Sequence, residues 1–317
     1  MNKSLPWIKP NRELDEATHR VVRALIDSKK DDKKLGKLPS KELTRLARAY
    51  KNAEQSRTPA GKFLRAFAEE MGLEDPDGSY FIADMKNLDR AAVKLTDAHR
   101  NISDLGRGRI YINSPKDYEA FYRVWRSKTK GGVVRLLGRD GETVADGSFR
   151  DYMKSPRKSG FAGFINFDIE IDLGKGRTGR FEVQIMPRAY ERIDKVSHKL
   201  FDMIRILEEA PPAYLTLGDK QVRDALILAN QALFVEHGIR THFIQFREDK
   251  MPRITSSKLD QATSILDRIW STLESLEGRR YSWMSDTKEA MTEAKTSLLN
   301  IHQAQKSGQA LNFGHKP

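Results

Sequence analysis

The stretch that decides the fold is Ile165-Asn-Phe-Asp-Ile-Glu-Ile-Asp172, in which apolar and polar side chains alternate. A second alternating stretch, Arg180-Phe-Glu-Val-Gln-Ile185, follows after the glycine-rich segment Gly174-Lys-Gly-Arg-Thr-Gly179. A period of two residues is typical of a strand with one buried and one polar face. Two such strands joined by a short glycine-rich segment predict an antiparallel hairpin.

The segment between these strands matches the GxGxxG pattern of dinucleotide-binding loops. That fingerprint needs a strand before it and a helix after it, so that the pyrophosphate meets a helix N-terminus. Here a second strand follows the glycines. We therefore interpret the segment as a basic hairpin loop and reject a dinucleotide site.

Further strands and helices are predicted on both sides of the hairpin. Residues 106–113 and 132–138 are predicted strands, and residues 85–100 a predicted helix. Ser114 and Pro115 are expected to begin a helix that ends near residue 128. Pro187 is expected to open another helix, whose apolar stripe includes Ile193, Val196, Leu200, Ile204 and Leu207.

Both ends of the chain are predicted to be helical. Residues 1–75 carry polar helices, interrupted by a charged loop over 29–37, with helix starts at Ser40 and at Thr58-Pro59. The C-terminal region is expected to contain helices over 222–236 and 259–276, with Ser256 and Ser257 as caps of the second.

Composition excludes several classes of protein. The chain has 317 residues, which suggests about two domains. It contains no cysteine, which rules out disulfides, zinc–thiolate sites and a cysteine nucleophile. Neither a membrane-spanning apolar run nor a signal peptide is recognisable. The formal net charge is +12, from 56 Lys and Arg against 44 Asp and Glu, which favours polyanionic partners.

Common hydrolase signatures are missing from the sequence. Its seven histidines form neither an HExxH motif nor a His-Asp dipeptide. A zinc site or a His-Asp metal site is therefore unsupported. The Gly-x-Ser-x-Gly nucleophile elbow is absent as well.

Two carboxylates are candidates for chemistry. Glu182 lies on the polar face of the predicted hairpin, two residues from Gln184, so both side chains point the same way. Asp104 stands just before the predicted strand over 106–113. If the two strands are neighbours, the carboxylates converge and could hold Mg²⁺ beside a polyphosphate. The alternative is a pair of ordinary surface acids.

Positive charge is concentrated around these residues. Residues 86–158 contain 17 Lys and Arg against 9 Asp and Glu, a local excess of +8. Ammonium and guanidinium groups on a sheet would suit a triphosphate. Scattered surface charge is the alternative interpretation.

Four segments in order resemble the RelA/SpoT-like (p)ppGpp synthetase family. Residues 149–161, Phe-Arg-Asp-Tyr-Met-Lys-Ser-Pro-Arg-Lys-Ser-Gly-Phe, are similar to the family's "rDYi..pK..GY.SlH" segment. Residues 181–185, Phe-Glu-Val-Gln-Ile, are similar to "EvQIRt" and precede a helix that carries His198. Upstream, residues 85–95 resemble the "vK......Kl" helix, and residues 104–110 resemble the "DiaGvRI" strand. The match covers roughly residues 80–205.

The resemblance implies an α+β fold: a nucleotidyltransferase-like mixed β-sheet flanked by helices, with helical N- and C-terminal extensions. The segments would be a helical extension over 1–78, a synthetase domain over 79–212 and a helical region over 213–317. It also implies an enzyme that uses Mg²⁺, or Mn²⁺, and ATP to transfer pyrophosphate to the ribose 3′-hydroxyl of a guanine nucleotide. A cytoplasmic location follows from the same resemblance.

Roles carry over residue by residue. Asp104 would bind the metal, and Glu182 would help to bind it or activate the 3′-hydroxyl, with Gln184 beside it. Phe161, at the family's tyrosine position, would stack on the acceptor base, unless it is a core residue of the sheet. His198 would line the acceptor side. The phosphate-binding residues would be Lys86, Lys94, Arg109, Lys154 and Arg157.

The sequence departs from the family pattern at five positions. The family's Ser and His after the aromatic are Gly163 and Ile165, and its Arg after Gln-Ile is Met186. Arg107 replaces a glycine, and Asp84 replaces an arginine. We therefore expect weak discrimination among purine acceptors.

Two further functions stay open. The protein could be a toxin that modifies the 3′ end of tRNA, with an antitoxin or immunity protein as partner and delivery into a target cell's cytosol. It could also be a decayed member that binds a nucleotide or a partner protein.

Overall fold

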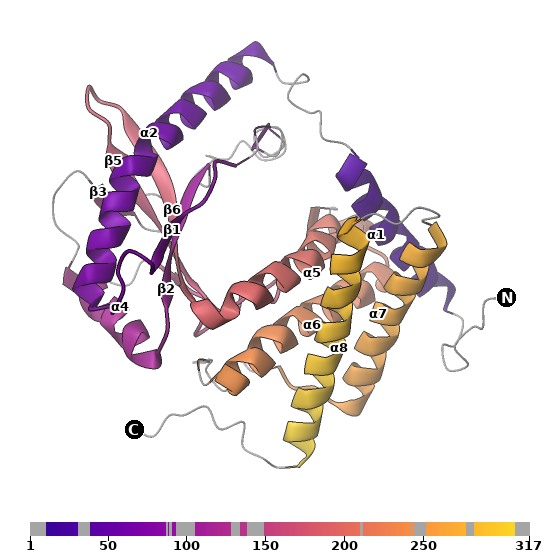
Figure 1. The fold of residues 1–317 in the computed structure, drawn as a ribbon. Coiled ribbons are helices and arrows are strands. Elements are labelled where there is room, and N and C mark those ends of the chain that lie inside the picture. The colour runs from indigo at the N-terminus through magenta and orange to yellow at the C-terminus, as the bar shows by residue number, and fades with distance from the viewer. Residues whose placement is uncertain are drawn as a thin grey trace. The chain divides into compact units, whose positions relative to one another are not determined.

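The structure is a computed structural model. It describes residues 11–30, 39–86, 88, 91–92, 105–127, 134–137, 149–209, 212–241, 243, 252–276 and 282–307. The chain divides into two compact units (Figure 1). The sheet unit comprises Asp31–Tyr152 and Phe164–Arg188, and the helical unit comprises Met1–Lys30, Met153–Gly163 and Ala189–Pro317.

A mixed β-sheet forms the centre of the sheet unit. In the described residues its strands are β1 (Tyr80–Ile82), β2 (Gly106–Ile112), β3 (Val134–Leu137), β4 (Arg150–Asp151), β5 (Ile165–Asp172) and β6 (Thr178–Pro187). Their order is β1-β2-β6-β5-β3, and β4 pairs with β5. Strands β2 and β6 are parallel, and the other pairs are antiparallel. The predicted hairpin is confirmed as β5 and β6, and the predicted mixed α+β class is confirmed with it.

Two helices, α2 (Ser40–Met71) and α4 (Pro115–Ser127), cover the apolar face of this sheet. Aromatic rings fill the space between the layers: the rings of Phe121 and Phe167 are 6.1 Å apart, and those of Trp125 and Phe167 are 4.7 Å apart. Strand β2 needs glycine here, because a Cβ on Gly108 would lie 2.7 Å from Leu64. The predicted helix start at Ser114-Pro115 is confirmed.

The predicted helix start at Thr58-Pro59 is wrong. Helix α2 continues through Pro59, and its buried positions continue on both sides of that residue, with Ser56 before it and Ala60 and Leu64 after it. Burial of one continuous stripe against the sheet outweighs the hydrogen bond that a proline inside a helix removes.

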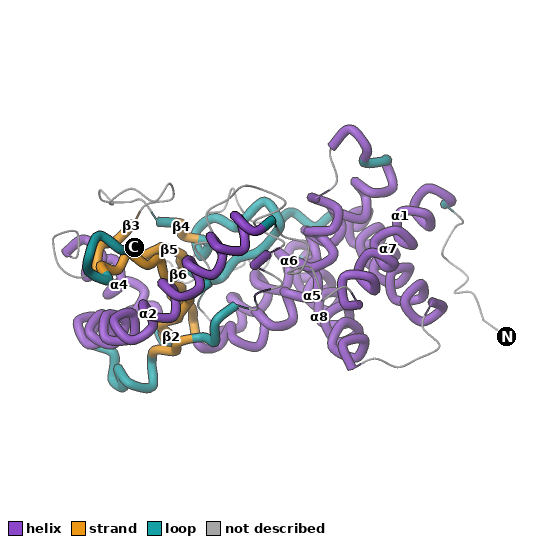
Figure 2. Tube along the Cα trace, turned by 90° about the horizontal axis from the view of Figure 1, so that it is seen from above, coloured by secondary structure: helices purple, strands orange, loops and turns teal. Residues whose placement is uncertain are grey.

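The helical unit contains α1 (Arg12–Lys30), α5 (Glu191–Glu209), α6 (Leu217–Thr241), α7 (Ser256–Leu276) and α8 (Ser282–Lys306). Helix α6 packs against each of the other four (Figure 2). Short 3₁₀ turns, Arg188–Tyr190 and Pro212–Tyr214, precede α5 and α6. The helices predicted over 222–236 and 259–276 are confirmed. No described helix has the length and apolar character needed to cross a membrane.

Several boundaries differ from the prediction. Pro187 ends β6, and α5 begins only at Glu191 after the 3₁₀ turn. Helix α7 is capped by Thr255, whose Oγ1 accepts a hydrogen bond from the Lys258 amide at 3.3 Å, rather than by the two serines. Most of the helix predicted over 85–100 lies outside the described residues. Of the residues that are described, Met85 and Lys86 are not helical, whereas Leu88, Ala91 and Ala92 are.

The two units also group the predicted segments differently. Helix α2 belongs with the sheet, whereas α1 and α5 belong with the C-terminal helices. Residues 153–163, in the middle of the family-like stretch, belong to the helical unit. This grouping depends on contacts between residues that are far apart in sequence, and local sequence patterns do not reveal such contacts.

Candidate active site

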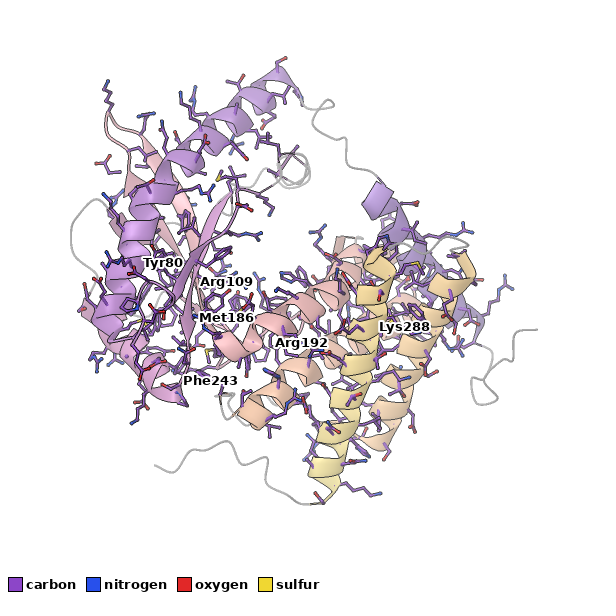
Figure 3. The ribbon with its side chains drawn as sticks, viewed as in Figure 1. Tyr80, Arg109, Met186, Arg192, Phe243 and Lys288 are labelled. Carbon is purple, nitrogen blue, oxygen red and sulfur yellow. The ribbon has the colours of Figure 1, made fainter. Side chains whose placement is uncertain are left out.

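A chain of hydrogen bonds joins three predicted site residues on the polar face of the sheet. Strands β2 and β6 run in parallel, with Arg109 beside Gln184 and Arg107 beside Glu182. Arg109 Nε donates to Gln184 Oε1 at 2.8 Å, and Gln184 Nε2 donates to Glu182 Oε1 at 3.1 Å. Arg109 also approaches Met186 Sδ at 3.7 Å (Figure 3). The chain fixes the orientation of the Gln184 amide between a cation and an anion.

A second carboxylate, which sequence analysis did not single out, faces Glu182. In the antiparallel pairing of β5 with β6, Asp168 lies directly opposite Glu182. Side chains in such a pair have Cβ atoms about 4.5–5.5 Å apart and share one face of the sheet. The alternation pattern placed Asp168 on the polar face, but only the register makes it the neighbour of Glu182.

The next row of the same face adds an amide and a further cation. Asn166 on β5 lies opposite Gln184, and Arg150 on β4 lies opposite Asn166. Adjacent residues of a strand point to opposite faces, so Asp151 points away from this row. The polar face therefore carries Arg109, Gln184, Asn166 and Arg150 side by side.

Asp151 fastens β4 to α4. Its Oδ2 accepts hydrogen bonds from the hydroxyls of both Tyr118 and Tyr122. Burial, followed by the charge of Asp151, raises the pKa of both phenols well above the usual value, so they remain donors at neutral pH. These bonds hold the short strand β4 against α4 and so fix the backbone position of Arg150, whose side chain lies on the polar face.

The residues predicted to line the acceptor side, Phe161 and His198, lie in the helical unit. Phe161 is 5% exposed, and its ring stacks on His198 at 5.1 Å. The rings of Phe201 and Phe234 lie 5.6 Å and 5.5 Å away. Such burial supports a core role for Phe161, in the helical unit rather than in the sheet. His198 covers one face of the Phe161 ring.

The loop that carries Phe161 is fixed to α6. Asn230 Nδ2 donates to the Ser159 carbonyl at 3.3 Å, and within the loop the Arg157 amide donates to the Phe161 carbonyl at 2.8 Å. Lys154 is exposed and Arg157 is half-buried on the same loop. The backbone that carries Lys154 and Arg157 is therefore held in place by these hydrogen bonds.

The departure at Gly163 has a steric explanation. Gly163 has φ of +82°, and a Cβ there would lie 2.3 Å from the ring of Tyr190. The Tyr190 ring is fully buried and fills the space that a serine would need. Glycine is therefore required at this position.

The predicted site residues fall into three groups. Lys86, Arg109, Glu182 and Gln184 belong to the sheet unit, and Lys154, Arg157, Phe161 and His198 belong to the helical unit. Lys86 is half-buried, and its amide donates to the Leu105 carbonyl at 3.1 Å, next to the start of β2. Asp104 and Lys94 lie outside the described residues.

The carboxylates of the polar face bear on whether Mg²⁺ fits there. Asp168 and Glu182 supply two neighbouring carboxylates, the number that Mg²⁺ commonly takes from a protein when phosphates complete its shell. Among the described residues there is no group of three or more His, Asp or Glu that could hold a metal ion. The face therefore fits an ion shared with a polyphosphate and does not fit an all-protein cage.

The chain is similar to a protein of known structure. No family model and no curated protein matches the chain. The chain is similar to the small alarmone synthetase 2 from Bacillus subtilis, with 17% sequence identity and a TM-score of 0.38. That similarity covers 60% of this chain and 96% of the other.

Proposed function

We propose that the protein is an ATP-dependent pyrophosphokinase that acts on the ribose 3′-hydroxyl of a purine nucleotide. One observation carries this proposal. The two family-like segments around Arg109 and Glu182 are far apart in sequence, yet they form neighbouring parallel strands whose polar side chains are hydrogen-bonded in register. The resemblance alone did not require this contact.

The proposed reaction moves the β- and γ-phosphoryl groups of ATP together. The acceptor's 3′-oxygen attacks the β-phosphorus and forms a new O–P bond, while the bond between the β-phosphorus and the α–β bridging oxygen breaks. AMP leaves with that oxygen. The hydroxyl proton passes to the Glu182 carboxylate and from there to solvent, as in general-base catalysis.

Charge on the polyphosphate must be neutralised during this transfer. Arg109 and Arg150 stand on the same face as Glu182 and supply planar guanidinium groups that suit phosphate oxygens. Mg²⁺, held by Glu182 with Asp168 or Asp104, would add further neutralisation when bound. Gln184, fixed between Arg109 and Glu182, keeps both side chains oriented.

The test uses ATP labelled at the α-phosphate or at the γ-phosphate. The protein is incubated with each label, Mg²⁺ and one acceptor at a time: GDP, GTP, ADP or bulk tRNA. We expect labelled AMP from the first label and labelled acceptor from the second, with similar rates for the purine nucleotides. Transfer to tRNA alone would change the acceptor to RNA, and an absence of transfer to all four would refute the proposal.

A matched pair of variants tests the role of Glu182. Glu182→Gln keeps the side-chain volume, removes the carboxylate and should lower the rate at least about 100-fold. Glu170→Gln makes the same change two residues from Asp168, where the carboxylate pairs with Arg135, and should keep most of the activity. Melting temperatures of both variants show that they are folded. Equal rates in the two variants would remove Glu182 from the mechanism.

A further inference from the structure

The tip of the β5–β6 hairpin is a basic surface outside the proposed active site. Lys175 and Arg177 are exposed on this tip, which lies beside α2 (Figure 1). Asn52 Nδ2 donates to the Thr178 carbonyl at 3.0 Å, and Gly179 packs so closely against Ser56 that a Cβ would not fit. The tip is therefore held in place by α2.

The backbone of the tip presents a lysine in a conformation that favours glycine. Gly174, Lys175 and Gly176 have φ of +75°, +54° and +70°. Among the residues that the structure describes, Lys175 is the only non-glycine residue with positive φ. Asp172 Oδ1 supports the turn by accepting a hydrogen bond from the Gly174 amide at 2.8 Å. This φ is uncommon for a lysine, since glycine or asparagine would adopt the turn more readily.

Within the described residues, Arg177 is held in place by neutral groups and has no ion-pair partner. Its guanidinium donates to Gln55 Oε1 at 3.2 Å and to the Leu173 carbonyl at 3.4 Å. Both acceptors are uncharged, so the full positive charge remains at the surface. Two of its N–H donors are already hydrogen-bonded, so the side chain loses less conformational entropy when a ligand binds.

Helix α2 extends the basic surface. Arg48 and Lys51 are exposed and lie about one turn before Asn52 and Gln55, the residues that contact the tip. Neither has an ion-pair partner within the described part of the chain. We call Arg48, Lys51, Lys175 and Arg177 the tip surface. Among the described residues, the acids closest to it in sequence are Asp172, used in the turn, and the exposed Glu54.

The residue types on this surface favour one class of anionic partner over the others. The described residues with exposed large apolar side chains are Phe81, Tyr214, Leu217 and Leu299, and none lies on α2 or on the tip. An amphipathic membrane-surface helix combines basic residues with apolar ones that enter the bilayer, and protein interfaces are centred on buried aromatic or apolar anchors. Basic residues alone also attract anionic lipid headgroups, and a measurement with anionic vesicles separates that case from polynucleotide binding. A surface with charge alone is typical of contact with a phosphate backbone.

We infer that the tip surface binds the phosphate backbone of a polynucleotide. The inference does not depend on pyrophosphate transfer, because none of the four residues is part of the proposed active site. Backbone contacts carry no sequence information, so binding should be similar for unrelated sequences.

The experiment measures binding of the full chain to fluorescent 20-nucleotide RNA and DNA of mixed sequence, bulk tRNA and vesicles containing anionic lipid. The tip variants are Lys175→Asn with Arg177→Gln, and Arg48→Gln with Lys51→Gln; asparagine keeps the preference for positive φ. The control is Lys116→Gln with Arg123→Gln on α4, two exposed cations whose loss gives the same net charge. Melting temperatures and the nucleotide-dependent activity of each variant are measured in parallel.

We expect each tip variant to weaken polynucleotide binding and to reduce the salt dependence. Loss of two backbone contacts lowers the slope of log K against log salt by about 1.4 for a single strand. Between 50 and 200 mM salt, the wild type should therefore lose about sevenfold more affinity than the tip variant. Slopes for the tip variants equal to that of the control would overturn the inference, as would binding to vesicles but not to polynucleotides. Because catalysis uses other residues, either result leaves the proposed reaction standing.

Discussion

Replacing Phe161 by alanine should lower the stability of the helical unit substantially. The side chain is 5% exposed and loses contacts with His198, Phe201 and Phe234. Truncation of a buried phenylalanine costs about 3–5 kcal/mol. In a unit of this size each kcal/mol shifts the melting temperature by about 2–4 °C, so we expect a drop of about 6–20 °C.

Calorimetry is the direct assay, with Tyr214→Ala as the control. Tyr214 is 79% exposed in the same unit, so its truncation should change stability by no more than about 0.5 kcal/mol. A milder variant, Phe161→Leu, stays folded and permits kinetics. An unchanged melting temperature in Phe161→Ala, together with a raised acceptor KM in Phe161→Leu, would refute the core assignment and restore the stacking role.

Two further predictions concern stability. Burial, aided by the Arg240 charge, lowers the pKa of His237, although its bond to the Ala189 carbonyl at 2.7 Å opposes this. The unfolded chain therefore binds the proton more readily, and the free energy of unfolding should fall as the pH drops below about 6.5. Melting curves from pH 7.5 to 5 should show this fall in the wild type and less of it in His237→Gln. Equal falls in the two proteins would contradict the assignment. Tyr118→Phe removes a donor to the Asp151 carboxylate and should lower the free energy of unfolding by about 1.5–3 kcal/mol in urea titrations, whereas no change would show that the bond contributes nothing.

Local patterns predict the strands and helices of this chain well where burial has a clear period. The alternation in residues 165–172 and the apolar stripe of α5 are strong signals. Strand β5 forms over the expected residues, and α5 contains the expected stripe although it begins four residues later than predicted. Pro59 misleads because its local preference for a helix start is weaker than the burial of the whole α2 stripe. The position of a helix end is thus less predictable than its existence.

The candidate site is predictable only in part. Glu182 and Gln184 share a face because they are two residues apart, and that follows from the sequence. Asp168 joins them only through the register of β5 with β6, and the bonds from Tyr118 to Asp151 depend on the packing of α4. Register and packing are properties of the whole chain, so no short window contains them.

The long-range contacts within the helical unit have a consequence for synthesis on the ribosome. Helix α1 is synthesised before the other helices of its unit, but Arg20 bonds to Asp219, which lies 199 residues later in the chain. At about 5–20 residues per second, α1 waits on the order of 10–40 s for this partner. During that time α1, whose Val21 and Val22 are fully buried in the finished protein, lacks its contacts with α6 and α7. A chain truncated before α6 would expose this apolar stripe. Chaperones would therefore bind it and proteases would degrade it, because it would not form a smaller folded protein.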